Sequence, residues 1–132
     1  MTSPSTLRFT NSHEWIQSID GGKVRVGISD HAQEALGDIV FVELPASGQI
    51  LKTGEECAVM ESVKAAADIY APVSGTVTAV NLELTDSPGA INEEAFAAWL
   101  FEITPLDPKT LAEELETLMD AESYNSFLAE ST

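Results

Sequence analysis

The hydrophobic and polar positions of this chain alternate over several short stretches, which is the pattern of β-strands with one buried face. Residues 23–28 show it most clearly, because Val, Val and Ile alternate there with Lys, Arg and Gly. Residues 15–19 precede them across Asp20-Gly21-Gly22. Glycine accepts the positive φ that a tight turn requires, so this segment predicts a β-hairpin.

Further strands are expected around two similar turn motifs. Pro45-Ala46-Ser47-Gly48 recurs as Pro72-Val73-Ser74-Gly75, and each motif combines a proline of fixed φ with a glycine of permissive φ. Residues 39–44 form a nearly continuous apolar run, typical of a well-buried strand. The other expected strands are residues 49–51, 57–61, 66–70, 76–80 and 99–103. Because the two motifs lie symmetrically about residues 61 and 62, the sequence predicts a mainly β fold, a flattened barrel with approximate two-fold symmetry.

Helical patterns occur in one short internal segment and near the C-terminus. Asp30 is the expected N-cap of the internal helix, and Gly37 supplies its left-handed end. Asp107 precedes a proline and Asp120 follows the next apolar positions, so we expect both to cap C-terminal helices over residues 107–129. The inward positions would be Leu111, Leu115, Leu118, Met119, Tyr124, Phe127 and Leu128, with Glu113, Glu114 and Glu116 mostly facing water.

Length and charge bound the possible functions. A chain of 132 residues suits one compact domain over residues 1–132, in which residues 1–6 are rich in Ser, Thr and Pro and expected to be frayed. The 22 acidic and 6 basic residues give a formal net charge of −16. This charge argues against nucleic acid and membrane partners, which need clustered Lys and Arg, and favours partners with basic docking faces. A monomer without membrane spans or signal peptide is expected.

The residues that usually carry catalysis or metal binding are few and poorly placed. Cys57 is the only cysteine, so there is no internal disulfide, and the neighbouring Glu55 and Glu56 disfavour a thiolate. His13 and His31 have no nucleophile or second metal ligand at useful spacing. Phosphate-binding loops and serine elbows are absent from the sequence. We therefore expect a structural cysteine, no metal site and no intrinsic enzymatic activity.

Lys64 is the residue around which the chain is organised. It is one of six cationic residues and falls between the strands expected at residues 57–61 and 66–70, at a hairpin tip. Small residues follow it at Ala65 and Ala66, which leaves room for an enzyme to close over the turn. Acylation of its amine would take the formal charge from −16 to −17. The sequence therefore predicts that Lys64 is presented for modification by another protein.

Four blocks of the sequence carry a family resemblance. They are Ser12-His13-Glu14-Trp15, residues 26–45, Glu61-Ser62-Val63-Lys64-Ala65 and residues 68–75. In this order and spacing they closely resemble the H proteins of the glycine cleavage system, and the resemblance covers nearly the whole chain. Biotin carriers instead have Met on both sides of the modified lysine, so the setting of Lys64 resembles a lipoyl site.

The resemblance implies a lipoyl/biotinyl-type barrel-sandwich hybrid that is a carrier and not itself an enzyme. Lys64 would bear lipoic acid in amide linkage, added by a lipoate-attaching enzyme. Glycine decarboxylase (P protein) would load an aminomethyl group, and aminomethyltransferase (T protein) would pass the one-carbon unit to tetrahydrofolate. Dihydrolipoamide dehydrogenase (L protein) would then reoxidise the dithiol. The resemblance also implies that Glu14, with Asp68 as a second candidate, holds the cationic amine of the loaded arm in a water-excluding cleft.

One segment departs from the family pattern. After Asn92 the family usually has an acidic-Pro-aromatic-Gly loop, whereas residues 93–98 read Glu-Glu-Ala-Phe-Ala-Ala and are shorter. This composition favours a helical turn and changes the local cleft wall and partner docking.

Three other functions stay open: an H-like lipoyl carrier of another lipoate pathway (lipoate relay or sulfur oxidation), an interaction module with Lys64 unmodified, and an undetected enzyme. The expected compartment is the bacterial cytoplasm, with the mitochondrial matrix open for a processed form.

Overall fold

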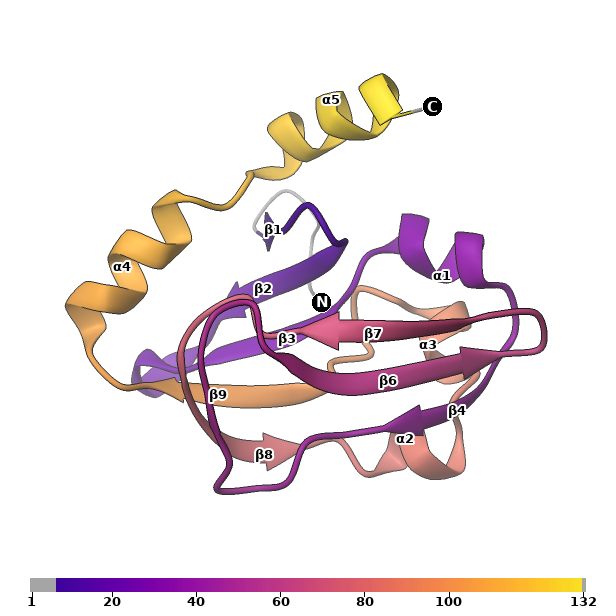
Figure 1. Ribbon diagram of the computed structural model, residues 1–132, viewed down its shortest axis with the longest axis horizontal. Helices are drawn as coiled ribbons and strands as arrows, with labels where there is room; N and C mark the ends of the chain where they lie inside the picture. The colour runs from indigo at the N-terminus through magenta and orange to yellow at the C-terminus, as the bar shows by residue number, and fades with distance from the viewer. Residues whose placement is uncertain (1–6, 132) are drawn as a thin grey trace.

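The computed structural model describes residues 7–131, and two antiparallel β-sheets dominate it (Figure 1). The strands are β1 (Arg8–Phe9), β2 (Glu14–Ser18), β3 (Val24–Ile28), β4 (Ile39–Glu43), β5 (Ile50–Leu51), β6 (Glu56–Ser62), β7 (Ala66–Tyr70), β8 (Gly75–Val80) and β9 (Phe101–Pro105). The helices are α1 (Asp30–Leu36), α2 (Glu83–Asp86), α3 (Ala90–Glu93), α4 (Pro108–Glu116) and α5 (Ala121–Ser131), with a 3-10 turn, η2, at Asp20–Gly22. One sheet has the order β1-β2-β3-β9-β8-β5 and the other β4-β6-β7.

The expected mainly β architecture, with a short internal helix and C-terminal helices, is confirmed. The sheets remain two open layers, where the sequence predicted a flattened barrel. The fraying expected of residues 1–6 lies outside the described residues. Within residues 7–131, none of the helices has the length and apolar character needed to cross a bilayer.

The first hairpin forms as predicted, because Gly21 and Gly22 have φ of 81° and 74° between β2 and β3. The pairing places Trp15 opposite Gly27. A Cβ on Gly27 would lie 2.4 Å from Trp15 Cε2, so glycine is required for the indole to lie across β3. The indole Nε1–H also donates to Ala95 O at 3.0 Å, which ties this hairpin to the segment after α3.

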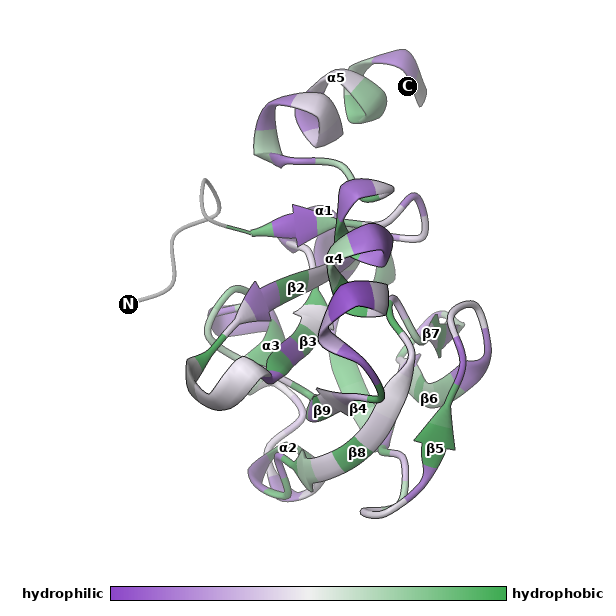
Figure 2. Cartoon of the chain, turned by 90° about the vertical axis from the view of Figure 1, so that its left-hand side faces the viewer, coloured by the Kyte–Doolittle hydropathy of each residue, from purple (hydrophilic) through white to green (hydrophobic). Residues whose placement is uncertain are grey.

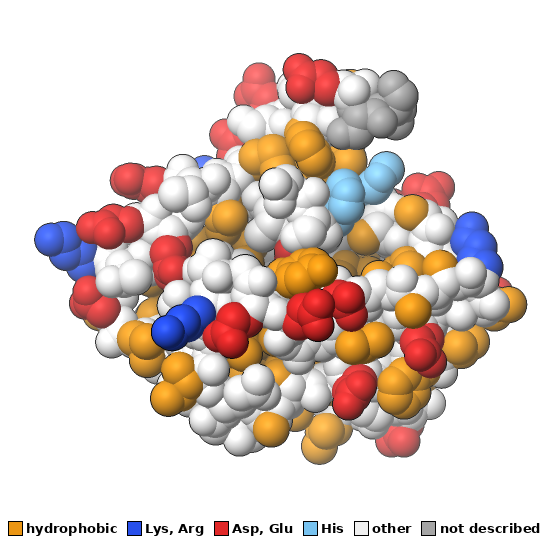
Figure 3. All heavy atoms as spheres, viewed as in Figure 1, with side chains coloured by type: hydrophobic (Ala, Val, Ile, Leu, Met, Phe, Trp, Pro, Cys, Tyr) orange, Lys and Arg blue, Asp and Glu red, His pale blue; other side chains and the backbone are white. Residues whose placement is uncertain are grey.

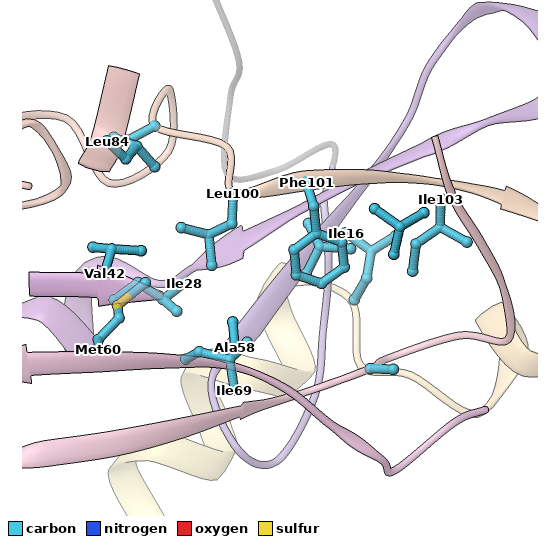
Figure 4. Packing of buried hydrophobic residues seen from close by; sticks show 14 of the residues in the cluster. Ile16, Ile28, Val42, Ala58, Met60, Ile69, Leu84, Leu100, Phe101 and Ile103 are labelled. Atoms are coloured by element: carbon cyan, nitrogen blue, oxygen red, sulfur yellow. The ribbon is translucent and has the colours of Figure 1, made fainter. Parts of the chain in front are cut away.

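Hydrophobic residues occur on strands of both sheets (Figure 2), and two clusters of buried side chains hold the layers together. Figure 4 shows part of the larger cluster. The larger cluster fills the space between the sheets, and it includes Val42, Met60 and Ile69 from the smaller sheet. From the larger sheet it takes Val24, Val26, Val77, Phe101 and Ile103. The smaller cluster lies beneath α5 and consists of Leu7, Phe9, Trp15 and Tyr124. Burial of this apolar area is the main force that fixes both sheets and α5 in place.

Strand β4 is only partly buried, although the sequence predicted a well-buried strand. Ile39 and Val42 are buried, but Val40 and Phe41 are 58% and 47% exposed. The register with β6 shifts between Ile39 and Phe41, and such a bulge turns consecutive side chains to the same side. Because β4 is also an edge strand, its continuous apolar run does not mean that both faces of the strand are buried.

The internal helix also begins differently from the prediction. Ser29, and not Asp30, is the N-cap of α1, because the Ser29 hydroxyl accepts a hydrogen bond from Ala32 N–H at 3.2 Å. Gly37 ends the helix with φ of 83°, as predicted. The helical turn expected in residues 93–98 is present, since Glu94 O accepts hydrogen bonds from Ala97 N–H at 3.0 Å and Ala98 N–H at 2.9 Å.

The C-terminal helices form with both predicted caps. Asp107 accepts from Lys109 N–H at the start of α4, and Asp120 accepts from Ser123 N–H at the start of α5. The sequence predicted that Glu114 faces water, and this is wrong. Its carboxylate accepts hydrogen bonds from Ser74 N–H at 3.0 Å, Ser74 Oγ at 2.8 Å and Thr53 Oγ1 at 2.5 Å. Glu114 therefore fastens α4 to the loops beside β5 and β8.

The two repeated turn motifs lead into β5 and β8, which pair antiparallel with Ile50 opposite Thr76. The glycines of the motifs serve different purposes. Gly48 has φ of 91°, whereas a Cβ on Gly75 would lie 2.4 Å from Ile103 Cγ2. Both motifs thus lead into a strand of the same sheet, but their glycines adopt different backbone conformations.

Candidate functional site

Lys64 lies at the tip of the β6–β7 hairpin, as the sequence predicted (Figure 1). The last ladder pair is Glu61 with Ala66, and Ser62 N–H donates to Ala65 O at 2.7 Å across the turn. The Ser62 hydroxyl accepts from Lys64 N–H at 3.3 Å and from Ala65 N–H at 3.0 Å. Ser62 therefore stabilises a tight turn through local hydrogen bonds and leaves the Lys64 side chain outside it.

The Lys64 side chain is exposed and lies over the corner between α1 and β4. Its Cε is 3.3 Å from the position that a Cβ on Gly37 would occupy. Among the described residues the one salt bridge joins Arg25 to Glu102 at 2.9 Å, so no described carboxylate lies within 4.0 Å of the Lys64 ammonium. An amine without an ion-pair partner, beside a 77% exposed Val63, is accessible to an enzyme that closes over the tip.

A groove begins beside the hairpin on β7 and leads toward the start of β2. We call it the β7 groove and define it by two cavities, of about 190 and 510 Å³, that share Ser12 as a lining residue. The smaller cavity begins at Ala67 and Asp68 and is lined by Ser12, His13, Ile28, His31, Ala32, Ala35, Leu36, Ala67, Asp68 and Ile69. The larger continues past Glu14 and Tyr70 to residues 117–119. The face that carries β6 and β7 is hollowed beside the histidine side chains (Figure 3).

Glu14 is a buried carboxylate in the wall of the larger cavity, 1% exposed. Its Oε1 accepts from Thr10 Oγ1 at 2.5 Å and from Ser12 Oγ at 2.6 Å, and its Oε2 accepts from Tyr70 N–H at 3.3 Å. All three donors are neutral. Asp68 is instead exposed on β7 in the wall of the smaller cavity. The two predicted carboxylates thus lie along the same groove, Asp68 near the hairpin and Glu14 farther along it.

A second group of polar residues, which the sequence did not indicate, connects α5 to α1 and β2. The Tyr124 hydroxyl is 2.7 Å from both Ser29 Oγ and His13 Nδ1, and the His31 ring centroid is 4.9 Å from that of His13. Burial, then the neighbouring His31, lowers the pKa of His13, although Glu14 acts in the opposite direction. Burial raises the pKa of Tyr124. These contacts join positions 95 and 111 residues apart, which no local pattern could reveal.

Cys57 behaves as the structural cysteine that the sequence predicted. Its thiol is half-buried and donates to Ile69 O at 3.4 Å. Burial, followed by Glu14 and Glu55, raises the pKa of Cys57 to about 12, so the thiolate is disfavoured at neutral pH. In the described part of the chain, His, Cys, Asp and Glu form no cluster of three or more that could hold a metal ion.

The fold and the exposed hairpin lysine define a class of protein: a barrel-sandwich domain of the lipoyl type, which presents one lysine at the tip of a stiff hairpin. Within that class, the chain belongs to the Glycine cleavage H-protein family, whose sequence profile matches residues 7–131.

Relatives and a solved structure agree with this assignment. A protein of Nitrosospira multiformis named Glycine cleavage system H protein is 52% identical over 128 residues, covering 97% of this chain and 96% of that protein. Glycine cleavage system H protein 2 of Pseudomonas putida is 53% identical over 127 residues, covering 96% and 97%. The crystal structure of an H protein from Mycobacterium marinum superposes with a TM-score of 0.82 at 37% identity, covering 94% of this chain and 97% of that one.

Proposed function

We propose that this protein is the lipoyl carrier of a glycine cleavage system and that Lys64 is the attachment site. The observation that carries the proposal is an exposed, unpaired lysine at the tip of a hairpin that adjoins a groove with a buried carboxylate. Family membership supplies the chemistry: H proteins act in glycine cleavage, and the resemblance implies lipoate in amide linkage. The protein is then a carrier without catalytic activity of its own.

The residues around Lys64 fit an acylated lysine. The amine attacks an activated lipoyl carboxyl only in its neutral form, so the attaching enzyme removes a proton from Nζ as the C–N bond forms and the activating group leaves. Small side chains at Ala65 and Ala66 are exposed beside the lysine and leave space for that enzyme. Apolar side chains such as Ile28, Leu36 and Ile69 border the start of the groove and suit a hydrocarbon arm.

Glu14 and Asp68 are proposed to hold the cargo. When bound, the lipoyl group would supply a dithiolane that carries the aminomethyl group from glycine decarboxylase to aminomethyltransferase and that dihydrolipoamide dehydrogenase would reoxidise. The amine of this cargo is a cation. Glu14 is a buried anion whose partners are two hydroxyls and one amide, so a cation in the groove would offset the cost of burying that charge. Asp68 lies closer to the hairpin and would act earlier along the path.

The three glycine cleavage enzymes and a lipoate-attaching enzyme are the proposed partners, and the bacterial cytoplasm is the proposed compartment, supported by bacterial relatives. The alternative is an H-like carrier in another lipoate pathway. The test is glycine-dependent exchange of the carboxyl carbon with labelled bicarbonate, using purified glycine decarboxylase and the lipoylated protein. We expect exchange with the wild type and none with Lys64→Arg. A lipoylated wild type that supports no exchange would place the protein in the other pathway.

A further inference from the structure

Asn92 lies within α3 (Ala90–Glu93), and its side chain reaches the corner between α1 and β4. Its Nδ2 donates to Gly37 O at 2.8 Å and to Gln33 Oε1 at 2.9 Å, and its Oδ1 accepts from Ile39 N–H at 2.9 Å. Both amide hydrogens and the oxygen are therefore used. The partners lie 53 to 59 residues away in sequence, so Asn92 fixes the corner from another part of the fold.

The corner that Asn92 holds is the support of the lysine hairpin. Asp38 O accepts a hydrogen bond from Val63 N–H at 3.1 Å, which ties the residue before Lys64 to the corner. The Lys64 Cε lies over Gly37, 3.3 Å from where a Cβ would be. The corner therefore contacts the hairpin tip twice, once through the backbone and once beneath the lysine side chain.

The corner benefits from this external support because its backbone conformation is unfavourable for most residues and the strand pairing beside it is irregular. Gly37 has φ of 83° and ψ of −156°, a conformation open mainly to glycine, and glycine loses much conformational entropy when it is fixed. Immediately after the corner, the pairing of β4 with β6 is interrupted by the shift between Ile39 and Phe41. The strand ladder thus holds the corner weakly at the point where the hairpin tip rests on it.

We propose that Asn92 is a positioning residue for Lys64: by fixing residues 37–39, it sets the orientation in which the hairpin tip meets the lipoate-attaching enzyme. This inference rests on the proposed function of Lys64 as an acylation site. The hydrogen bonds of Asn92 go to Gln33, Gly37 and Ile39, so it would act on Lys64 indirectly, through Gly37 and Asp38. Without it, only a fraction of molecules would present the turn correctly, which raises the apparent KM by the inverse of that fraction.

The test compares Asn92→Ala with Asn81→Ala, a matched control. Asn81 also uses its side-chain amide to bind a distant carbonyl, Trp99 O at 2.9 Å. It lies between β8 and α2, and its hydrogen bonds within residues 7–131 do not reach the β6–β7 hairpin. Octanoyl transfer from octanoate and ATP by a purified lipoate–protein ligase is followed by intact mass over a range of carrier concentrations. Amide exchange at Val63 and acetylation of amines by a small activated ester are measured on the same samples.

For Asn92→Ala we expect kcat/KM to fall about tenfold, mainly through KM, with faster exchange at Val63 and unchanged chemical acetylation of Lys64. Asn81→Ala should match the wild type in all three. Wild-type transfer kinetics for Asn92→Ala, or an equal loss in both variants, would overturn the inference. If the alanine variant is poorly folded, Asn92→Asp keeps the shape and the acceptor for Ile39 N–H, loses both donors, and is expected to show the same loss. Continued acylation of Lys64→Arg would instead overturn the proposed function and not this inference.

Discussion

Replacing Glu14 by glutamine removes one negative charge from the β7 groove while keeping the side-chain shape. Oε1 accepts hydrogen bonds from the hydroxyls of Thr10 and Ser12, whereas Oε2 accepts one from Tyr70 N–H. A glutamine carbonyl placed at Oε1 keeps the two hydroxyl contacts, but its NH2 then faces the Tyr70 N–H, donor against donor. The substitution therefore removes at least one hydrogen bond together with the charge.

The size of both effects can be worked out from the contacts of Glu14 and an assumed charge separation. A hydrogen bond to a charged group contributes about 1.5–3 kcal/mol, so we expect the free energy of unfolding to fall by about that amount. For the cargo, two unit charges about 4 Å apart interact by about 1 kcal/mol in water and about 4 kcal/mol at an effective dielectric of 20. Because the groove opens to water, we take the lower value, which corresponds to a release of the aminomethyl group about fivefold faster.

The assay loads the lipoylated protein with labelled glycine and glycine decarboxylase and follows the decay of the loaded form. Glu14→Gln should be lipoylated at the wild-type rate and should lose its label about fivefold faster. Glu116→Gln is the matched control, because it makes the same charge change on an exposed residue that does not line the groove. A loaded Glu14→Gln protein that decays no faster than the Glu116→Gln control would show that Glu14 does not hold the cargo.

Three further changes test other contacts. Gly27→Ala would place a Cβ 2.4 Å from the Trp15 ring, and overpacking of about 1–3 kcal/mol should lower the Tm in a calorimetric scan; an unchanged Tm would contradict the close approach. Tyr124→Phe leaves His13 Nδ1 and Ser29 Oγ without their shared partner, so urea unfolding should show a loss of about 1–3 kcal/mol, and a neutral result would refute the bonding. Burial raises the pKa of Glu114, but hydrogen bonds from Thr53 and Ser74 together outweigh it and lower the pKa below 4.5. The stabilisation that the ionised Glu114 gives the fold is therefore present above pH 4.5 and is lost as the pH falls through the lowered pKa. The stability difference between wild type and Glu114→Gln should accordingly shrink in urea titrations below pH 4.5, and a difference independent of pH would contradict this.

The sequence predicted the features that depend on local patterns. The alternation in residues 23–28, the glycines after Asp20 and the run around Lys64 each indicate a strand or a turn from neighbouring residues alone, and the structure has them there. The caps at Asp107 and Asp120 are equally local. The position of Lys64 at a hairpin tip could therefore be predicted without the fold.

The features that escaped prediction depend on where distant segments meet. Ser29 and Asp30 are both good capping residues, so the local sequence does not decide which one is the N-cap of α1. Ser29 takes that role where its hydroxyl is buried against Tyr124, a contact between distant segments. Phe41 belongs to an apolar run, but the shifted register at the sheet edge turns it outward. The roles of Glu114 and Asn92 consist of hydrogen bonds to residues 40 to 61 positions away, which leave no trace in the local sequence.

Mass spectrometry of the protein from cells able to make lipoate tests most directly whether this amine is the point of attachment. The account predicts a gain of one lipoyl amide, assigned by peptide fragmentation to Lys64 and absent from Lys64→Arg. An unmodified wild-type protein from lipoate-replete cells, or a lipoyl group on any other lysine, would contradict it.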